Sequence, residues 1–514
     1  MDETVIDVAI VGGGVSGVYM GWRLLTADLS QSNLGGEGPL NVQLFELSDR
    51  IGGRLISLDP PEMVGIKAEF GGMRYLTNQP LVAGLVQQLG LATRPFPVSG
   101  PENIYYIRGQ HLRQREFANP DKVPYRVRWQ ERGKTPGQLI MEAIDVLIPG
   151  ATKLTAEQWL EVKKNYKFNG RYLWELGFWN LLHQVMSSEA YKLVMDAGGY
   201  NTTMTNWNAA EAIPWYLSDF GPEAEYRTVI DGMERLPLTL AQRFTQAGGK
   251  IHFDNRLNTF LRREDGLIQL EIDGRSPLLA RHLVLAMPRR ALELLDDDTD
   301  YLLHPEVRPL IPTVTPHPMF KLFLCYRYPW WQDAGVNNGR SVTDLPVRQV
   351  YYFGSEAEGP AAFNRELRDS LVMASYDDGP FVGFWTGLAE QGHSTTHCFP
   401  ESESDEPRWK RYACPPGMIA HAQRQLQLVH DLEYIPEPYA AGFQDWGQDP
   451  FGGAWNSWNI HVKAWEVQER IVQPLVDTAV YIIGEAYSGS QGWIEGALET
   501  AETLLQQKWG VAHG

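Results

Sequence analysis

The sequence predicts an α/β fold in which a parallel βαβ unit is interleaved with a mixed β-sheet and a helical subdomain. The βαβ unit is indicated by an apolar, largely β-branched run at residues 5–11, followed by a glycine-rich turn and a helical pattern from Val15 to about Leu29. A second apolar run at residues 41–46 ends on a carboxylate and closes the unit. This order of elements is typical of a Rossmann-type, nucleotide-binding domain.

The remaining segments differ in their periodicity. From about Lys134 to Asp219 the pattern is helical, whereas alternating strands return at residues 250–273, and residues 281–288 form a buried strand that ends at a proline. We therefore expect three interleaved parts: a Rossmann-type domain from residues 1–76, 226–300 and 441–514, a mixed-sheet substrate-binding domain from residues 77–133 and 301–440, and a helical subdomain from residues 134–225.

Composition excludes several classes of function. The chain of 514 residues has a formal net charge of -18, which disfavours nucleic-acid binding because phosphates require clustered Lys and Arg. The cysteines, Cys325, Cys398 and Cys414, have no metal-ligand or C-x-x-C spacing, so we predict neither a metal site nor a disulfide framework. We see no apolar run of the roughly 18 residues that a membrane span needs and no signal peptide, and we expect a cytoplasmic protein.

Gly12, Gly14 and Gly17 form a G-x-G-x-x-G fingerprint between the first strand and the first helix. The first glycine permits the tight turn, the second lets the backbone approach a pyrophosphate, and the third allows close packing of the helix. Val15 and Ser16 begin the helix, whose N-terminus attracts phosphate groups. Glu46, at the end of the second strand, is expected to accept hydrogen bonds from the adenosine ribose, although it follows the last glycine at an unusually long distance.

Two further segments identify the dinucleotide. Arg50-Ile51-Gly52-Gly53-Arg54 resembles the second signature of the flavin amine oxidases, in which an arginine and paired glycines run beside the pyrophosphate of FAD. Gly484 and Glu485 resemble the C-terminal turn that brings a carboxylate towards the ribityl chain in that family. The segment 484–501 contains no cysteine for covalent attachment, so the resemblance implies non-covalent FAD. The predicted FAD contacts also include Leu257, Gly492, Trp493 and Ile494.

The segment Glu69-Phe70-Gly71-Gly72-Met73-Arg74 points to the substrate. Arginine carries a planar fork of donors that suits a bidentate grip on a carboxylate. The segment resembles the L-amino acid oxidases, in which the arginine binds the substrate carboxylate, and Gly71, Gly72, Met73 and Arg74 are also expected beside the cofactor. The alternative is an arginine that is exposed or salt-bridged.

Other site residues follow from the same resemblance. Lys321, in an apolar strand, needs a partner on physical grounds, and in flavin amine oxidases such a lysine holds a water near flavin N5. Otherwise it is a strand-edge lysine that reaches solvent. Tyr376 falls where the family places a hydroxyl beside the substrate carboxylate, or it is an ordinary core tyrosine. Trp493 is expected to form a wall of the pocket, unless it serves packing alone.

The resemblance fails at one position. Some family members carry a histidine base upstream of a segment like 227–237, whereas residues 215–226 here contain Asp219, Glu223 and Glu225 and no histidine. Either the substrate binds as a neutral amine, or a carboxylate or water takes its proton. A carboxylate such as Asp219 can instead contact a cationic substrate side chain, but an exposed loop acid is the simpler interpretation.

Together these features predict an FAD-dependent L-amino acid oxidase. Lys321, Arg74 and Tyr376 are its predicted catalytic residues, and Trp493 and Asp219 also contact the substrate. The reaction is oxidative deamination to a 2-oxo acid, ammonia and hydrogen peroxide, by hydride transfer from Cα to flavin N5 with O2 as the final acceptor. The alternatives are a related amine oxidase, an amino-acid 2-monooxygenase or a non-catalytic flavin-binding protein. The sequence leaves the oligomeric state open, a homodimer included.

Overall fold

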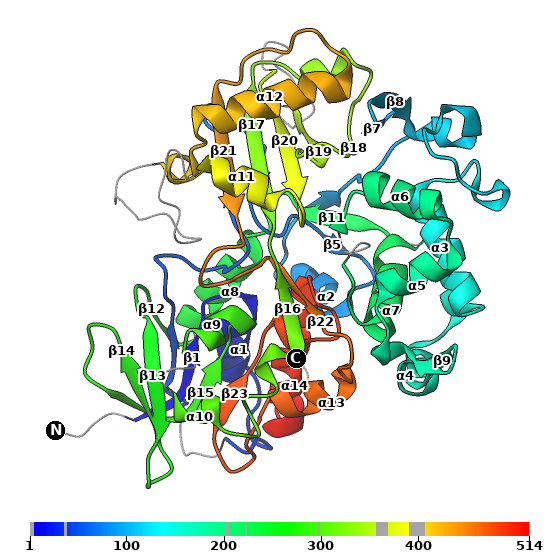
Figure 1. Ribbon diagram of the computed structural model, residues 1–514. Helices are drawn as coiled ribbons and strands as arrows, with labels where there is room; N and C mark the ends of the chain where they lie inside the picture. Colours follow the sequence, from blue (N-terminus) through cyan, green and yellow to red (C-terminus); the bar gives the residue numbers. More distant parts are fainter. Residues whose placement is uncertain are drawn as a thin grey trace.

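The computed structural model describes residues 5–34, 39–201, 205–221, 224–295, 299–355, 368–389 and 407–512. Cys398 and Glu223 therefore lie outside the described residues. Among the helices in these ranges, none has the length and apolar character required to cross a membrane. The predicted mixed α/β fold is confirmed, and its elements form two large sheets with a group of helices beside them (Figure 1).

The first sheet occupies the lower part of Figure 1. Its parallel strands run in the order β12-β2-β1-β15-β23, and two antiparallel strands, β14 and β13, extend it from the start of β15. The strands are β1 (Ile6–Val11), β2 (Val42–Phe45), β12 (Lys250–His252), β13 (Leu257–Arg262), β14 (Ile268–Ile272), β15 (Leu278–Leu285) and β23 (Val480–Ile482). The strand predicted at residues 281–288 thus begins three residues earlier and ends before its proline.

Helices on the first sheet join distant parts of the chain. Helix α1 (Val15–Thr26) packs against α8 (Arg235–Gln246) and α14 (Ile494–Thr503), and α14 packs against α2 (Pro80–Gln88). Helix α1 ends at Thr26, before the predicted Leu29. The Asp28 carboxylate accepts a hydrogen bond from the Ser30 backbone N–H, a local turn that competes with helix continuation.

Two glycines of the fingerprint are required by close packing. Gly12 has φ +113°, and a Cβ there would overlap the carbonyl oxygen of Ala286, which follows β15. A Cβ on Gly17 would overlap the carbonyl oxygen of Gly12. A side chain at either position would therefore push α1 away from the two central strands.

The second sheet lies in the upper part of Figure 1, with strand order β21-β17-β20-β19-β18-β7-β8. Helices α11 (Val382–Ala389) and α12 (Pro416–His430) pack on one of its faces. The strands are β7 (Ile104–Ile107), β8 (Gln110–Arg113), β17 (Phe320–Tyr326), β18 (Arg340–Thr343), β19 (Gln349–Ser355), β20 (Ser370–Asp377) and β21 (Ala440–Asp445).

Because side chains alternate along each strand, some residues of this sheet face the covering helices and others lie on the opposite face. In β17, Phe320, Leu322 and Leu324 pack with the helices, so that Lys321 lies on the opposite face with Phe323. In β19, Val350 and Tyr352 pack with the helices, and Tyr351 lies with Phe323. Tyr376, paired with Lys321 in the register of β17 and β20, belongs to the same face. This face packs with Phe70 of the Glu69–Arg74 segment.

The predicted helical segment forms a group of helices beside both sheets, with its own apolar core (Figure 1, right). It contains α3 (Pro136–Leu147), α4 (Ala156–Asn165), α5 (Phe178–Val185), α6 (Ser188–Ala197) and α7 (Ala209–Phe220), together with a short hairpin of β9 (Lys167–Phe168) and β10 (Arg171–Tyr172). The exact domain boundaries stay predictions.

Short ladders connect these parts. A small sheet, β5-β11-β6, places Arg74 directly before β5, and β16 pairs with β22 between the two large sheets. The remaining short elements are β3 (Ser57–Leu58), β4 (Ala68–Glu69), β5 (Tyr75–Leu76), β6 (Thr93–Pro95), β11 (Tyr226–Val229), β16 (Val314–His317), β22 (Trp455–Trp458), α9 (Arg289–Glu293), α10 (Asp300–Leu303) and α13 (Ala464–Ile471).

The packing at the glycine turn gives a first testable prediction. Gly17→Ala is expected to lower the free energy of unfolding by about 1–3 kcal/mol, because the new methyl group must displace the Gly12 carbonyl. Thermal and denaturant unfolding would measure the effect. Gly84→Ala, in α2 and with no atom within 4 Å of the added Cβ, is the matched control and should be neutral or stabilising. Equal stability of Gly17→Ala and the parent would contradict the steric argument.

Candidate functional site

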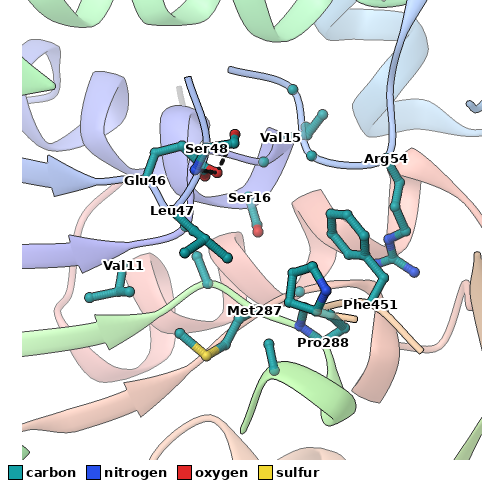
Figure 2. Close-up of a pocket in the computed structure, with 18 of the residues that line it drawn as sticks. Val11, Val15, Ser16, Glu46, Leu47, Ser48, Arg54, Met287, Pro288 and Phe451 are labelled. Carbon is teal, nitrogen blue, oxygen red and sulfur yellow. Dashed lines mark hydrogen bonds between the residues drawn. The ribbon is translucent and has the colours of Figure 1, made fainter. Parts of the chain in front are cut away.

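A cavity of about 840 Å³ lies at the carboxyl ends of the parallel strands of the first sheet. Ligands of open parallel sheets bind at this edge, and the volume is within the roughly 300–1,000 Å³ of typical cofactor sites. Figure 2 shows Glu46, Leu47 and Ser48 on one side of the cavity, Met287 and Pro288 on another, and Arg54 beside Phe451. The cavity therefore has the place and size that a dinucleotide requires.

The turn at Gly14 presents an uncapped helix N-terminus to this cavity. Gly14 is the N-cap of α1, no side chain caps the helix, and a Cβ on Gly14 would have no heavy atom within 4 Å. The first N–H groups of α1, at Val15 and Ser16, thus border open space in the cavity lining. The helix dipole and these free donors favour a phosphate group at this position.

Glu46 lies one residue beyond β2 and lines the same cavity. Its Oε2 accepts a hydrogen bond from the Gly13 backbone N–H at 2.6 Å, and its Oε1 accepts from the backbone and side chain of Ser48 at 2.9 and 2.7 Å (Figure 2). These bonds fix the carboxylate, whose remaining lone pairs can accept from a ligand hydroxyl.

An ion pair between Arg54 and Glu485 joins the two ends of the chain at the cavity. Arg54 Nη1 lies 3.0 Å from Glu485 Oε2 and donates to the Ala454 carbonyl at 2.8 Å. Glu485 also accepts from the backbone N–H groups of Asn456 and Gly492, at 3.0 and 2.7 Å. The buried carboxylate therefore organises the C-terminal turn around the guanidinium.

The structure brings most of the predicted cofactor residues together in this lining: Gly12, Gly14, Val15, Ser16, Glu46, Arg54, Gly72, Leu257, Gly484, Glu485, Gly492, Trp493 and Ile494. Gly17 is not among the lining residues and serves packing, whereas Gly71, Met73 and Arg74 border a second cavity. Sequence reasoning missed Asn255, Met287, Pro288 and Phe451. These residues lie in loops and carry no motif, so no local signal identifies them.

A second, inner cavity of about 140 Å³ shares Arg54, Gly72 and Trp493 with the first. Its lining combines residues from the second sheet, including Lys321 and Tyr376, from α7 and from the C-terminal turn at residues 492–494, together with Arg74. Three residues that sequence reasoning placed in one site, from segments about 250 and 300 residues apart, thus lie around one small space. This is the geometry of a reaction chamber beside a cofactor.

Arg74 is neither exposed nor salt-bridged. Its Nη2 donates to the Tyr200 hydroxyl at 2.7 Å, its Nη1 lies 3.4 Å from the Tyr351 hydroxyl, and its guanidinium lies 4.6 Å from the centre of the Tyr226 ring. Among the described residues, no Asp or Glu forms an ion pair with it. A guanidinium that borders a cavity and lacks an acidic partner is suited to bind an anion.

Lys321 is 1% exposed and lies in β17, between β21 and β20, so the strand-edge interpretation is wrong. Its Nζ donates to the backbone carbonyls of Glu69, at 3.0 Å, and of Gly71. Burial lowers the pKa of Lys321 below its ordinary value, and burial raises the pKa of the Glu69 carboxyl. The partner that the sequence demanded is thus the backbone of the Glu69–Arg74 segment.

Tyr376 borders the inner cavity with only 7% of its surface exposed. Lys321 Nζ lies 5.4 Å from the centre of its ring, and the rings of Tyr200 and Tyr351 lie 5.6 and 6.1 Å away. Burial raises the pKa of Tyr376 well above its ordinary value, so the hydroxyl stays protonated and can donate a hydrogen bond.

Asp219 is a buried acid and not the exposed loop acid that was the simpler expectation. It lies in α7, is 3% exposed, borders the inner cavity and accepts a hydrogen bond from Trp493 Nε1 at 3.0 Å. Burial raises its pKa well above the ordinary value, although the bond from Trp493 opposes that change. The sequence pattern failed here because helix α7 turns this position inward, against the C-terminal turn. Glu225 is exposed.

Aromatic side chains that the sequence could not assign complete the inner cavity. Trp215 and Trp455 stack with ring centres 6.3 Å apart, and Phe220 and Trp446 also border the space. Trp215 Nε1 donates to the Gln491 carbonyl at 2.8 Å, which ties α7 to the C-terminal turn. Because the chain contains 17 tryptophans, no sequence pattern distinguishes these from tryptophans that serve packing alone.

Comparisons with known proteins agree with this geometry. The chain is 28% identical to Aplysianin-A of Aplysia kurodai, over 98% of this chain and 90% of that protein, and 27% identical to achacin of Lissachatina fulica, over 98% and 93%. It is 23% identical to L-amino acid oxidase Bs29 of Bothriechis schlegelii, over 97% and 89%. The solved structure of putrescine oxidase bound to putrescine has the same fold, with a TM-score of 0.68, 18% identity and 98% of both chains covered.

The family assignment rests on a match that spans most of the chain. The model of the family described as flavin containing amine oxidoreductase matches residues 32–503, which include Glu46, Arg54, Arg74, Lys321 and Glu485. The predicted kinship with flavin amine oxidases is thereby confirmed, and membership of this family implies a flavin cofactor. The chain belongs to the flavin containing amine oxidoreductase family.

Proposed function

We propose that this oxidoreductase is an FAD-dependent L-amino acid oxidase, which converts an L-amino acid to a 2-oxo acid, ammonia and hydrogen peroxide. The observation that carries the proposal is Arg74, whose guanidinium borders the inner cavity without an acidic partner in the described part of the chain. A half-buried cation at the border of the inner cavity favours a substrate with a carboxylate over a simple amine.

FAD, held without a covalent bond, fits the larger cavity. Glu46 is placed to bind the ribose of the adenosine, and the start of α1 to bind the pyrophosphate. Neither Cys325 nor Cys414 is among the described residues that line the cavity. A bound flavin would supply the electron acceptor for oxidation of the substrate at Cα and the route of the electrons to O2.

The chain itself supplies position, charge and a closed environment. Arg74 would hold the substrate carboxylate, with the Tyr376 hydroxyl as a second donor at the same cavity. Trp493 lines both cavities and would form a wall beside the substrate. Lys321 is fixed by two carbonyls, which supports the predicted role of holding a water beside the flavin. Orientation of this kind removes much of the entropic barrier of the reaction.

Asp219 supports a preference for substrates with a cationic side chain. It is a buried carboxyl that borders the inner cavity, and Asp378 is a second one. A cationic side chain would favour the ionised form of Asp219 against the effect of burial. Trp215 and Trp455 provide apolar walls for the methylene groups of such a side chain.

Simple measurements distinguish the proposed activity from two other activities and from one non-catalytic role. An amino-acid 2-monooxygenase would release CO2 and an amide, and an amine oxidase would prefer a substrate without a carboxylate, against which Arg74 argues. A non-catalytic flavin-binding protein would keep its flavin oxidised when mixed anaerobically with amino acids. The proposal requires that the flavin is bleached under those conditions.

Replacement of Arg74 tests the carboxylate assignment. Arg74→Ala is expected to keep its flavin and to lower kcat/KM for amino acids by roughly 30-fold to several thousand-fold, which corresponds to the about 2–5 kcal/mol of a buried charge pair. Arg94→Ala, which removes an exposed arginine, is the control. Peroxide release would be measured for an amino acid and for its decarboxylated amine. The same proportional loss on both substrates would contradict the assignment.

Replacement of Glu485 tests how the flavin is retained. Glu485→Gln keeps the side-chain shape but removes the charge opposite Arg54, and should weaken flavin binding roughly 10- to 150-fold, since hydrogen bonds to charged groups contribute about 1.5–3 kcal/mol. Flavin release would be followed by fluorescence on dilution. Glu499→Gln, which alters the same turn at Gly489 and Ser490, is the control. Equal release by both variants would indicate a general loosening of the turn.

Replacement of Asp219 tests the substrate side chain. The parent should prefer L-lysine to L-norleucine, whose side chain has similar length and no charge. Asp219→Asn retains an acceptor for Trp493 and should reduce that preference roughly 10- to 150-fold in kcat/KM. Glu225→Gln is the control for loss of a nearby charge. A parent enzyme that prefers L-norleucine would overturn this part of the proposal.

A further inference from the structure

Two arginines converge on the hydroxyl of Tyr351, behind the proposed carboxylate site. Arg74 Nη1 and Arg340 Nη1 each lie 3.4 Å from this oxygen, and Tyr200 forms a hydrogen bond with it. Arg340 comes from β18 and its guanidinium lies 4.3 Å from the centre of the Tyr200 ring. The pair of tyrosines is thus enclosed by the two guanidinium groups.

The hydrogen bonds around the two tyrosines can accommodate the loss of one proton. A neutral phenol offers two acceptor sites and one donor, whereas a phenolate offers three acceptor sites. Arg74 and Arg340 present two donors to one Tyr351 oxygen, and the Tyr200 hydroxyl can be a third. Tyr200 already accepts from Arg74 Nη2 at 2.7 Å, so its own proton can point to Tyr351. A Tyr351 phenolate satisfies all three donors.

The charges around Tyr351 also favour loss of its proton. The other contacts of Arg340 are the Gln349 side chain and the Tyr200 and Tyr351 rings, and among the described residues no Asp or Glu pairs with either arginine. Burial opposes ionisation of Tyr351, but Arg340 and Arg74 outweigh it and lower the pKa of this tyrosine. Arg74 and Arg340 are two neighbouring positive charges without a carboxylate partner among the described residues. A side chain that can lose its proton, such as Tyr351, would balance one of them.

We propose that Tyr351 is the proton-linked counterion of Arg74: its hydroxyl loses a proton between Arg74 and Arg340 as the pH rises, and regains one from solvent when a carboxylate binds Arg74. This rests on the proposed role of Arg74. Arg340 is a positioning residue, because it acts on the substrate through Tyr351. The bound carboxylate and the phenolate compete for the same guanidinium, so binding of one disfavours the other.

The sign of the linkage follows from this competition. A carboxylate on Arg74 raises the pKa of Tyr351 above its value in the free protein, because it partly neutralises one of the two cations. Between these two pKa values binding takes up a proton, and affinity for the carboxylate falls as the pH rises. The dissociation constant can increase by at most about tenfold for each pH unit inside that window. Below the window, the affinity is independent of Tyr351.

Other titratable groups around Tyr351 come from several elements. Tyr105 on β7 interacts electrostatically with both Tyr351 and Arg340, and Tyr376 on β20 has its ring centre 6.1 Å from that of Tyr351. On the side of Arg74 lie Tyr226 and Asp219, and Asp378 lies near Tyr376. Burial raises the pKa of each of these groups, so Tyr351 alone among them has its pKa lowered.

The test uses the flavin-loaded enzyme and benzoate, a carboxylate without an oxidisable amine. Its dissociation constant would be measured by the change in flavin absorbance from about pH 6 to about pH 10, a range that brackets a lowered tyrosine pKa. The parent should bind benzoate more weakly as the pH rises, and Tyr351→Phe should lose that dependence while keeping its flavin. Tyr105→Phe removes a neighbouring phenol that is not hydrogen-bonded to Tyr351 or Tyr200, and this variant should retain the pH dependence of benzoate binding.

Two further measurements keep the test independent of how well Tyr351→Phe folds. Mixing the parent with benzoate in weakly buffered solution inside the window should take up close to one proton for each site, as read by a pH indicator. Arg340→Gln should move the pH range over which benzoate binding weakens to higher pH, because a cation beside Tyr351 is lost. Arg340→Lys keeps a cation there and should return that range most of the way to its position in the parent. A pH-independent dissociation constant without proton uptake in the parent, or an unchanged slope in Tyr351→Phe, overturns the proposal.

The outcome also separates this proposal from the function on which it rests. If Arg74→Ala binds benzoate as tightly as the parent at every pH, the carboxylate role of Arg74 is wrong. If Arg74→Ala binds benzoate weakly but the parent shows no pH-dependent affinity, Arg74 keeps its role and only the linkage to Tyr351 is overturned.

Discussion

The close approach of the glycine turn to the central strands is the constraint on which the whole arrangement depends. Gly12 and Gly17 have no room for a side chain, because carbonyl oxygens of Ala286 and of Gly12 itself occupy that space. Only this packing lets α1 begin at the edge of the sheet with its free N–H groups facing the larger cavity. The Arg54–Glu485 pair then fixes the C-terminal turn across the cavity, and that turn carries Trp493 to the inner one.

Charge is handled differently in the two cavities. In the larger one, Glu46 and Glu485 are held by several donors and are matched by an arginine or by backbone N–H groups. In the inner one, Arg74 and Lys321 contact only hydroxyls, carbonyls and rings in the described part of the chain, and Asp219 is held by a tryptophan. Groups left without a fixed counterion in a small enclosed space are available to a substrate that carries opposite charges.

Much of the cofactor site could be predicted from local patterns, since a strand, a glycine turn, a helix and a terminal acid lie within one short segment. Arg74 and Lys321 were also identifiable, one through its motif and the other because a charge in an apolar strand demands a partner. The interpretation of Asp219 as an exposed loop acid was wrong, because its burial depends on the contact of α7 with Trp493, 274 residues away along the chain. Tyr200, Trp215, Trp455 and Arg340 carry no motif, and nothing in their neighbourhood in the sequence distinguishes them from core residues.

The sequence by itself determined the nucleotide-binding turn, the flavin signature and the arginine of the Gly72-Met73-Arg74 segment, because each depends on residues that are adjacent in the chain. Only the tertiary structure decided which hydroxyls, rings and acids surround that arginine. Strand alternation places Lys321, Tyr351 and Tyr376 on one face of the second sheet, and the packing of that face against α7 and the C-terminal turn closes the inner cavity. Such contacts join residues hundreds of positions apart, and no local pattern specifies them.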